Sequence, residues 1–159
     1  MAEDARASED LDEVEQLAWQ GLLAVMLVGI PQVERTFRER GLVHIEYALL
    51  NGLNVQSMTL SELANLSNVS ISRLSHRMSK LVDRGYVLVR PSEADGRVSV
   101  AEITDRGREL LAEIAPAHTR ALREVIFDHL SKEQVAALAE TMQHVGARLG
   151  ACMGRNLQP

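Results

Sequence analysis

The spacing of apolar residues changes twice, without a break, between Thr59 and Gly107. Two short segments with helical three-and-four spacing are followed by two β-rich runs joined around Asp95-Gly96, and a new helical pattern begins at Thr104. Two helices, the turn between them and a following hairpin make a winged helix-turn-helix, which places one helix in a DNA groove and a hairpin beside it. The sequence therefore predicts a mainly α protein with a small β-hairpin.

Local signals set the boundaries within this segment. Thr59 and Glu62 form a capping box that begins the first of the two helices. We expect the second helix over residues 70–84, before a glycine. The wing strands are expected over residues 86–90 and 97–103, because an Asp-Gly pair is a strong hairpin signal.

Charge is distributed unevenly along the chain. The 159 residues carry a net charge of −5, yet residues 70–100 hold six Arg/Lys against three acidic residues. An acidic protein does not bind nucleic acid indiscriminately, so we expect any DNA contact to be confined to this basic segment. The acidic N-terminus is unlike a signal peptide, which needs positive charge there.

A helical wheel of 100° per residue separates residues 70–84 into an apolar and a polar face. The positions expected to pack inward are Ile71, Leu74, Met78, Leu81 and Val82. A recognition helix reads bases with its N-terminal turns, and arginine suits bidentate contact with guanine. The candidates for contact with base edges are Ser72, Arg73, His76 and Arg77. The alternative for each basic side chain is a solvated helix face.

The remaining polar residues of this helix have other expected places. Lys80 and Arg84 lie farther along, where they would meet phosphates or water. Ser75 lies beside the apolar face, near the DNA backbone or partly buried.

The wing adds one further arginine. Arg97 follows the Asp-Gly tip, and a guanidinium there can enter a narrow minor groove. Asp95 is expected to orient it through a charge-assisted hydrogen bond. The alternative is a surface ion pair of little energetic weight. The full set of candidate DNA-contacting residues is Ser70, Ser72, Arg73, Ser75, His76, Arg77, Lys80, Arg84, Arg90, Asp95 and Arg97.

The helices expected outside the winged segment carry more apolar surface than a single subunit can bury. The first is expected from Ser8, as N-cap, to about Arg40-Gly41, with a kink or restart at Pro31. Residues 16–32 are uncharged, but their glutamines and Pro31 make a poor membrane span. A helix apolar nearly all round is instead expected to be buried in protein, which in so small a chain indicates a partner subunit.

The C-terminal half repeats this pattern. Thr104 is expected to cap a long helix bent at Pro116, and Ser131 with Gln134 forms a capping box for the last helix. That helix carries a coiled-coil-like seam of Val135, Leu138, Met142, Val145 and Leu149. The seam alone is equally consistent with an ordinary core-facing stripe. Together with the first helix it favours a homodimer.

These observations predict a single winged-helix subunit over residues 1–159. Dimerisation helices occupy 8–40 and 104–150, a short helix ends around Asn51-Gly52, and the DNA-binding lobe occupies 59–103. The single cysteine, Cys152, excludes an internal disulfide framework and suits a reducing cytosol. We expect no metal, no cofactor and no enzymatic activity, because clustered ligands and catalytic sets are missing from the sequence. Residues 1–7 are expected to be disordered.

Several motifs resemble those of the MarR (multiple antibiotic resistance regulator) transcription factors. They are SELANLSNVSISRLSHRMSKLVDRGYVLVR, the wing DGR at 95–97 and ITDRG at 103–107, within a match over residues 19–149. APAH and FDHLSKEQ resemble the branch common in high-GC actinobacteria. The resemblance implies a cytoplasmic, nucleoid-associated homodimer with interlocked terminal helices that binds palindromic operators. It also implies repression relieved by a small, often phenolic, ligand. Many relatives carry arginine at the position of His76.

The resemblance also indicates where such a ligand would bind. In similar proteins ligands lie between the dimerisation helices and the DNA-binding lobe, which on that analogy makes Trp19, His44, Tyr47 and His118 candidate pocket residues. The alternative places Trp19 and Tyr47 in the core and leaves the two histidines hydrogen-bonded or exposed. A different function, a winged-helix protein-interaction module without DNA binding, would show acidic or apolar residues on the recognition face.

Overall fold

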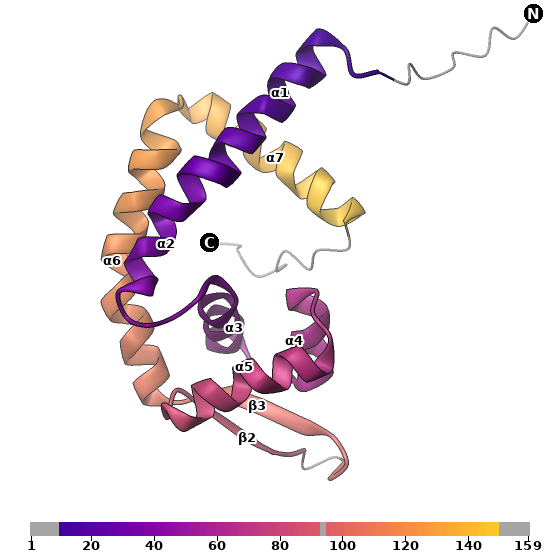
Figure 1. The fold of residues 1–159 in the computed structure, drawn as a ribbon, viewed down its shortest axis with the longest axis vertical. Helices are drawn as coiled ribbons and strands as arrows, with labels where there is room; N and C mark the ends of the chain where they lie inside the picture. The colour runs from indigo at the N-terminus through magenta and orange to yellow at the C-terminus, as the bar shows by residue number, and fades with distance from the viewer. Residues whose placement is uncertain (1–9, 93–94, 150–159) are drawn as a thin grey trace, which may run out of the picture.

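The computed structural model describes residues 10–92 and 95–149. Its elements, in chain order, are α1 (Glu13–Ala24), the π-helical turn η1 (Val25–Gly29), α2 (Ile30–Arg38), α3 (His44–Val55), β1 (Met58–Thr59), α4 (Leu60–Ser67), α5 (Ile71–Asp83), β2 (Val87–Pro91), β3 (Ser99–Ile103), α6 (Asp105–Val125), the 3-10 turn η2 (Phe127–His129) and α7 (Lys132–Arg148). Helices α3, α4 and α5 and the sheet form one lobe, from which α2 and α6 rise side by side (Figure 1).

The sheet has three strands, in the order β1-β3-β2, all antiparallel. Sequence patterns predicted only the β2–β3 hairpin, because two residues of β1 are too few to show alternation. Met58 pairs with Ala101, so β1 covers the free edge of β3. The predicted winged helix-turn-helix is thus confirmed, with this strand added.

The core lies where α3, α4, α5 and the sheet meet the start of α6. Its most deeply buried side chains are Phe37, Leu42, Leu49, Leu50, Leu63, Leu74, Leu81, Val87 and Ile114. Gly107 allows α6 to pack tightly on the sheet, because a Cβ there would lie 2.4 Å from the backbone oxygen of Tyr86. The DNA-binding lobe is therefore joined directly to the base of the long helix.

The N-terminal helix begins later than predicted. Ser8 lies outside the described residues and Asp10 precedes the helix, whose N-cap is Asp12. The amide of Glu15 donates to Asp12 Oδ1 at 2.8 Å and the amide of Asp12 donates to Glu15 Oε2 at 2.9 Å. This reciprocal capping box satisfies two orphan amides at once, which gives Asp12 the advantage over Ser8.

The predicted disturbance at Pro31 takes the form of the π-helical turn. The amide of Ile30 donates to the carbonyl of Val25, five residues earlier. A proline has no amide hydrogen and its ring crowds the carbonyl four residues before it, so a widened turn just ahead of Pro31 relieves the conflict. The helix then restarts as α2 and ends before Gly41, which has a φ of +70°.

Helix α3 runs on to Val55, so the predicted stop at Asn51-Gly52 is wrong. A Cβ on Gly52 would lie 3.1 Å from the side chain of Leu66 in α4. Glycine here provides room for a neighbouring helix, and the sequence signal for a helix end was misleading for that reason.

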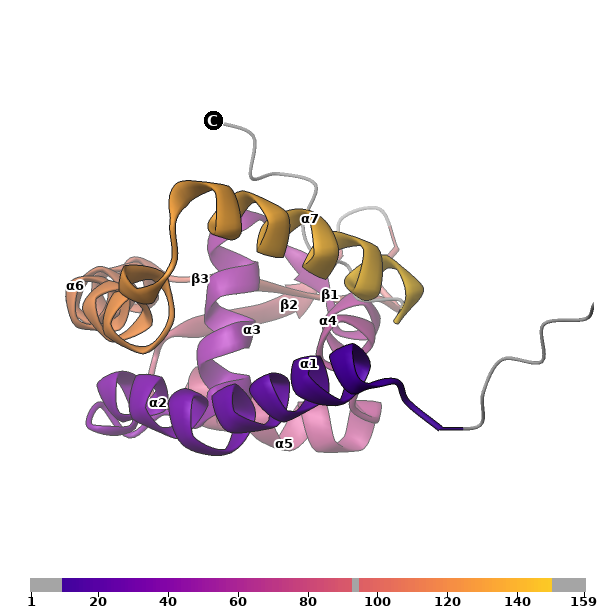
Figure 2. The same ribbon diagram turned by 90° about the horizontal axis from the view of Figure 1, so that it is seen from above.

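The predicted caps of the last two helices are confirmed. The side chain of Thr104 accepts from the amide of Gly107 at 3.1 Å, and Ser131 forms a reciprocal capping box with Gln134. Pro116 lies inside α6, which continues through it. Seen from above, α1 and α7 run along opposite sides of the molecule (Figure 2).

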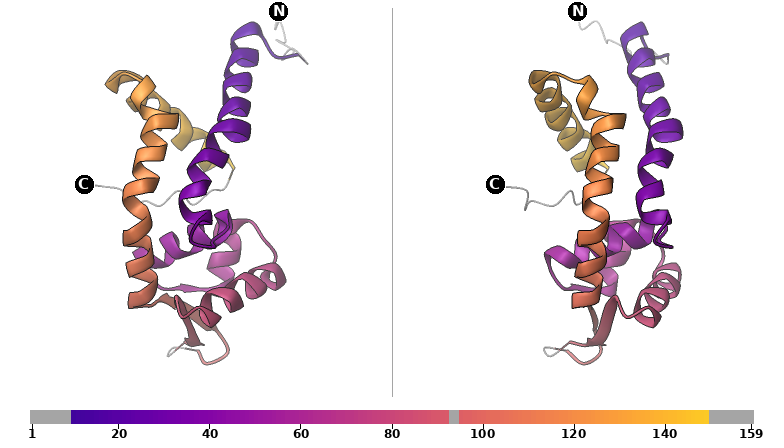
Figure 3. Two further views of the ribbon diagram at one scale, coloured as in Figure 1. Left: turned by 60° about the vertical axis from the view of Figure 1, so that its left-hand side comes forward. Right: turned by 90° about the vertical axis from the view of Figure 1, so that its left-hand side faces the viewer.

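Helix α1 buries none of its residues in the single chain. Its exposed apolar side chains, with those of η1, are Val14, Leu17, Trp19, Leu22, Met26, Leu27 and Val28. On α7, Val145 and Leu149 are exposed and the rest of the predicted seam is half-buried. Helices α1 and α7 extend beyond the winged lobe (Figure 3). By length and composition alone the continuous segment Glu13–Arg38 could cross a membrane, a test that core helices of soluble proteins also pass.

Candidate DNA-binding site

Helix α5 is positioned at both ends by local hydrogen bonds. Asn68, with a φ of +50°, makes the turn after α4, and the side chain of Ser70 caps α5 by accepting from the amide of Arg73. At the other end the amide of Tyr86 donates to the carbonyl of Leu81 at 2.9 Å. The predicted limits of this helix are therefore confirmed, and Tyr86 belongs to its end and not to the wing strand.

The inward face of α5 is narrower than predicted. Leu74, Met78 and Leu81 are buried in the core. Ile71 is 56% exposed and Val82 37% exposed, so their inward assignment was wrong. Both lie in terminal turns of α5.

The outward face of α5 is basic and open. Ser72, Arg73, His76 and Lys80 are all exposed. A groove of about 530 Å³ is lined by Ser72, Arg73, His76 and Arg77, together with Ile45 of α3 and Val69 of the turn. The predicted base-reading residues thus lie on one continuous surface.

Arg77 is anchored where its neighbours are not. It is half-buried, and its Nη1 donates to Oε1 of Glu46 in α3 at 3.3 Å. Glu46 is buried, and its other oxygen accepts from the amide of Val43 at 3.1 Å. Sequence reasoning missed Glu46, although an acidic residue three positions after the helix start is itself a capping signal. This pair fixes α5 against α3.

Arg84 is turned away from the outward face. Its Nη1 donates to the carbonyl of Gly41 at 2.8 Å and its Nη2 to that of Arg40 at 2.7 Å. The guanidinium also lies 4.9 Å from the centre of the Tyr86 ring. Its two terminal nitrogens thus bind within the protein, at a position where contact with phosphates or water was expected.

The serines of this segment also form internal hydrogen bonds. Ser70 Oγ caps the helix and lies 3.1 Å from Ser72 Oγ, while Ser75 Oγ donates to the carbonyl of Ile71 at 2.9 Å. A DNA phosphate only accepts hydrogen bonds and a hydroxyl has one hydrogen to donate, so Ser75 can contact a phosphate only by giving up the Ile71 carbonyl, whereas one of the pair Ser70 and Ser72 keeps its hydrogen available.

The wing differs in detail from the prediction. Strand β2 ends at Pro91 and β3 begins at Ser99, so Arg97 lies in the connecting loop and not in a strand. The amide of Val98 donates to the carbonyl of Asp95 at 2.9 Å, which closes a turn at the tip. Asp95 Oδ1 accepts from the backbone amide of Arg97 at 3.0 Å, where a bond to the guanidinium was expected. Arg90 forms an ion pair with Glu102 across the two strands.

Three of the four predicted ligand-pocket residues meet at the junction of α2, α3 and α6. The Tyr47 ring lies 4.8 Å from that of His118 and stacks on Phe37 at 4.6 Å. His44 Nδ1 lies 3.1 Å from Glu34 Oε1. Burial and the nearby His44 both lower the pKa of His118, whose Nδ1 lies 3.3 Å from Thr36 Oγ1. Trp19 is half-exposed on α1 and does not belong to this cluster.

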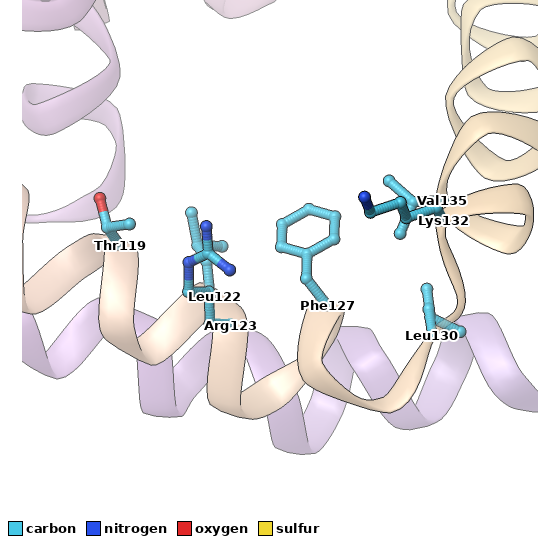
Figure 4. Close-up of a pocket in the computed structure, with 7 residues that line it drawn as sticks. All are labelled: Thr119, Leu122, Arg123, Phe127, Leu130, Lys132 and Val135. Carbon is cyan, nitrogen blue, oxygen red and sulfur yellow. The ribbon is translucent and has the colours of Figure 1, made fainter.

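A second concavity lies between α6 and α7 (Figure 4). It has a volume of about 550 Å³ and is lined by Thr119, Leu122, Arg123, Phe127, Leu130, Lys132 and Val135. Figure 4 shows the Phe127 ring in the middle of this surface, between residues of the two helices. Sequence reasoning did not identify it, because it depends on how η2 turns the chain.

Within residues 10–92 and 95–149, no group of three or more His, Cys, Asp or Glu residues is arranged to hold a metal ion. Cys152 lies outside the described residues.

Comparisons with known proteins agree with this geometry. The chain is 32% identical to Sco3205, a MarR family transcriptional regulator from Streptomyces coelicolor whose crystal structure is in complex with DNA, with a TM-score of 0.79 over 89% of this chain and 91% of that one. It is 28% identical to AbsC, a MarR family regulator from the same organism, with a TM-score of 0.80 over 89% and 98% of the two chains. It is 31% identical to the HTH-type transcriptional regulator YdgG of Bacillus subtilis over 73% of this chain and 80% of that protein. No protein-family model matches.

Proposed function

This chain belongs to the MarR family of DNA-binding transcriptional regulators, and we propose that it acts as a homodimeric repressor of palindromic operators. It is a regulator and not an enzyme. The observation that carries the proposal is the exposed basic face of α5, with Arg73, His76 and Lys80, beside a wing that carries Arg97. A protein-interaction module would need an acidic or apolar face at this place. Such a regulator is a soluble cytoplasmic protein, and we place it at the nucleoid.

We assign direct base contacts to Arg73 and His76, with Ser72 beside them. Arginine can donate two hydrogen bonds to guanine, and both residues lie in the N-terminal half of α5, which enters the major groove in helix-turn-helix proteins. Lys80 is assigned to a phosphate. Arg77 has a secondary role, since Glu46 already engages its guanidinium.

The proposed dimer uses α1, α2, α6 and α7. Helix α1 is apolar and unburied in the single chain, and α7 presents part of its apolar seam to solvent. Exposure of so much apolar surface to water is unfavourable, and its burial against a second subunit removes that cost. We therefore propose that the partner subunit, and not a bilayer, covers the segment Glu13–Arg38. Two recognition helices related by a two-fold axis would then meet half-sites about one helical turn, roughly 10 bp, apart.

The dimer is tested by adding charge to the seam. Leu138→Glu with Met142→Glu should give monomers or unfolded chain and abolish operator binding, whereas Ala139→Glu with Gln143→Glu adds the same charge to exposed positions of the same helix. Sedimentation measures dimerisation, and selection of bound duplexes from a random pool measures operator binding. A well-folded monomer of the unmutated protein, or selection of no sequence at all, would contradict the proposal.

We further propose that a small aromatic or phenolic effector acts at the cluster of Tyr47, His44 and His118. Rings and imidazole nitrogens suit a phenol, which stacks and hydrogen-bonds at once. The cluster joins α3 of the DNA-binding lobe to α2 and α6, so a ligand there can shift one against the other. In a panel of simple phenols and hydroxybenzoates, at least one should release DNA from the unmutated protein and fail to release it from Tyr47→Ala. Release that is equal for both proteins would contradict this site.

A further inference from the structure

The last residue of the recognition segment is bound to the end of the N-terminal helix. Arg84 follows α5 directly, and its two terminal nitrogens donate to the adjacent carbonyls of Arg40 and Gly41 at 2.7 and 2.8 Å. These carbonyls follow the end of α2. One side chain therefore connects the helix that faces DNA to a helix that packs on α6.

The chemistry of this contact is specific to arginine. The carbonyls in and after the last turn of a helix lack partners within it, and the negative end of the helix dipole favours a cation there. A guanidinium presents two donors in a fixed plane and can bind two carbonyls together, which an ammonium group cannot do in the same way. Gly41 permits the arrangement, because the chain turns there with a φ of +70°, which other residues rarely adopt.

The same loop is also bound to α6. The side chain of Arg40, whose carbonyl accepts from Arg84, forms an ion pair with Glu113 of α6. Tyr86 lies beneath Arg84 at 4.9 Å and beneath Arg106 of α6 at 5.4 Å. The C-terminal end of α5 is thus tied to both α2 and α6 through one small region.

We propose that Arg84 is a positioning residue that sets the distance between the two recognition helices, and thereby the half-site spacing that the protein accepts. The proposal rests on the dimer proposed above, in which α2 and α6 belong to the shared body and α5 projects from it. Arg84 contacts no DNA in this role. It acts by holding the end of α5 at one place relative to α2 and α6.

The matched variants are Arg84→Met, which keeps an unbranched side chain but removes both donors, and Arg84→Lys, which keeps the charge. Arg106→Met is the control for the loss of a cation over Tyr86, since Arg106 makes the same kind of ring contact. Lys80→Met is the control for the loss of one positive charge on α5. Thermal unfolding and sedimentation establish that each variant is folded and dimeric.

Binding is measured on the duplex selected by the unmutated protein, on duplexes with the spacer changed by one or two base pairs, and on a single half-site. We expect the unmutated protein to lose about tenfold or more in affinity per spacer change, and Arg84→Met to lose about threefold or less. Arg84→Lys should fall between them, and half-site binding should stay within about twofold of the unmutated value. Both controls should keep the full spacing preference.

A measurement without DNA tests the same point. With Cys152→Ser, a spin label at exposed Ser79→Cys reports the distance between the two α5 helices of the dimer. Arg84→Met should broaden this distance distribution, and Arg106→Met should not.

An unchanged distribution together with an unchanged spacing preference would overturn the proposal. The proposal would also be overturned if Arg84→Met bound every duplex more weakly by the same factor and with a lower salt dependence, as is expected of Lys80→Met. That behaviour indicates a phosphate contact. If the labelled protein with Arg84 intact sediments as a monomer and gives no dipolar signal, the dimer itself is wrong, and the role of Arg84 falls with it.

Discussion

Glu46 of α3 accepts a hydrogen bond from Arg77 of α5 at 3.3 Å, with the Glu46 side chain 5% exposed and the Arg77 side chain 35% exposed. A buried carboxylate is tolerated only when it is paired and hydrogen-bonded, and Glu46 meets both conditions through Arg77 and the amide of Val43. Arg77 therefore helps to hold the recognition helix α5 in place, while Arg73 on the preceding turn stays exposed.

The first prediction concerns this pair. Glu46→Gln keeps an oxygen that can cap α3 but removes the charge that Arg77 faces, so we expect a loss of about 1–3 kcal/mol in the free energy of unfolding. Urea denaturation measures it. Arg77→Met should have a related effect, and the double variant should cost less than the two single variants together, because both remove the same interaction. Strictly additive losses would show that the pair does not interact.

Local signals were enough to predict the recognition helix and the caps around it. Ser70, Thr104 and the box of Thr59 with Glu62 each act within three residues, so their geometry follows from the helix itself. The open basic face followed in the same way from the position of Arg73 and its neighbours on the wheel.

Contacts between distant parts of the chain could not be predicted in this way. Arg84 continues the same basic pattern as Lys80, yet it binds a loop more than forty residues earlier, which no local spacing indicates. Trp19 was grouped with Tyr47 by analogy, but it lies on α1, which the π-helical turn separates from α2 and which rises away from α3 (Figure 1). Gly52 carries the signal of a helix end although its role is to make room for Leu66.

The second prediction separates base reading from phosphate binding on α5. Arg73→Ala should relax base preference and cost about 1–3 kcal/mol on the operator, if its guanidinium is bidentate with guanine. Lys80→Ala should weaken operator and random DNA alike and reduce the salt dependence of both. Titrations of both duplexes at several salt concentrations measure these effects. Equal losses on operator and random DNA for Arg73→Ala would contradict the base-reading role.

The third prediction is a pH dependence of stability. The pKa of His118 is lowered by burial and by His44, so the folded protein binds a proton at this ring less readily than the unfolded chain does. Its contribution to stability is present above the ordinary histidine pKa of 6.5 and is lost as the pH falls below that value. The groups that face the ring are Thr36, Phe37, Tyr47 and His44 with its partner Glu34.

Urea denaturation between about pH 5 and pH 7 measures this dependence. His118→Phe should flatten the decline in the free energy of unfolding toward acid pH, because phenylalanine has no proton to bind. His144→Phe, at an exposed position of α7, is the control and should leave the decline in place. A decline that is equally steep in His118→Phe would assign it to other groups.

The last prediction concerns Arg97 in the wing. Its backbone amide is bound by Asp95, which shapes the turn and leaves the DNA contact to the side chain. If each subunit places this guanidinium in a minor groove or against a phosphate, Arg97→Ala removes two ion pairs per dimer. The slope of log affinity against log salt should then fall by about 1.8, taking 0.9 for each neutralised phosphate. Major-groove base preference should survive, and any preference for flanking A·T tracts should weaken.

Two other wing variants sharpen the comparison. Asp95→Ala should give a smaller version of the same defect, because it loosens the turn that carries Arg97 without removing the charge. Arg90→Ala removes an arginine that is already paired with Glu102, so it should change the slope less than Arg97→Ala does. Operator affinity measured over several salt concentrations decides between them. An unchanged affinity and slope for Arg97→Ala would mean that the wing has only a structural role, since a surface arginine that meets no phosphate releases no counterions from DNA.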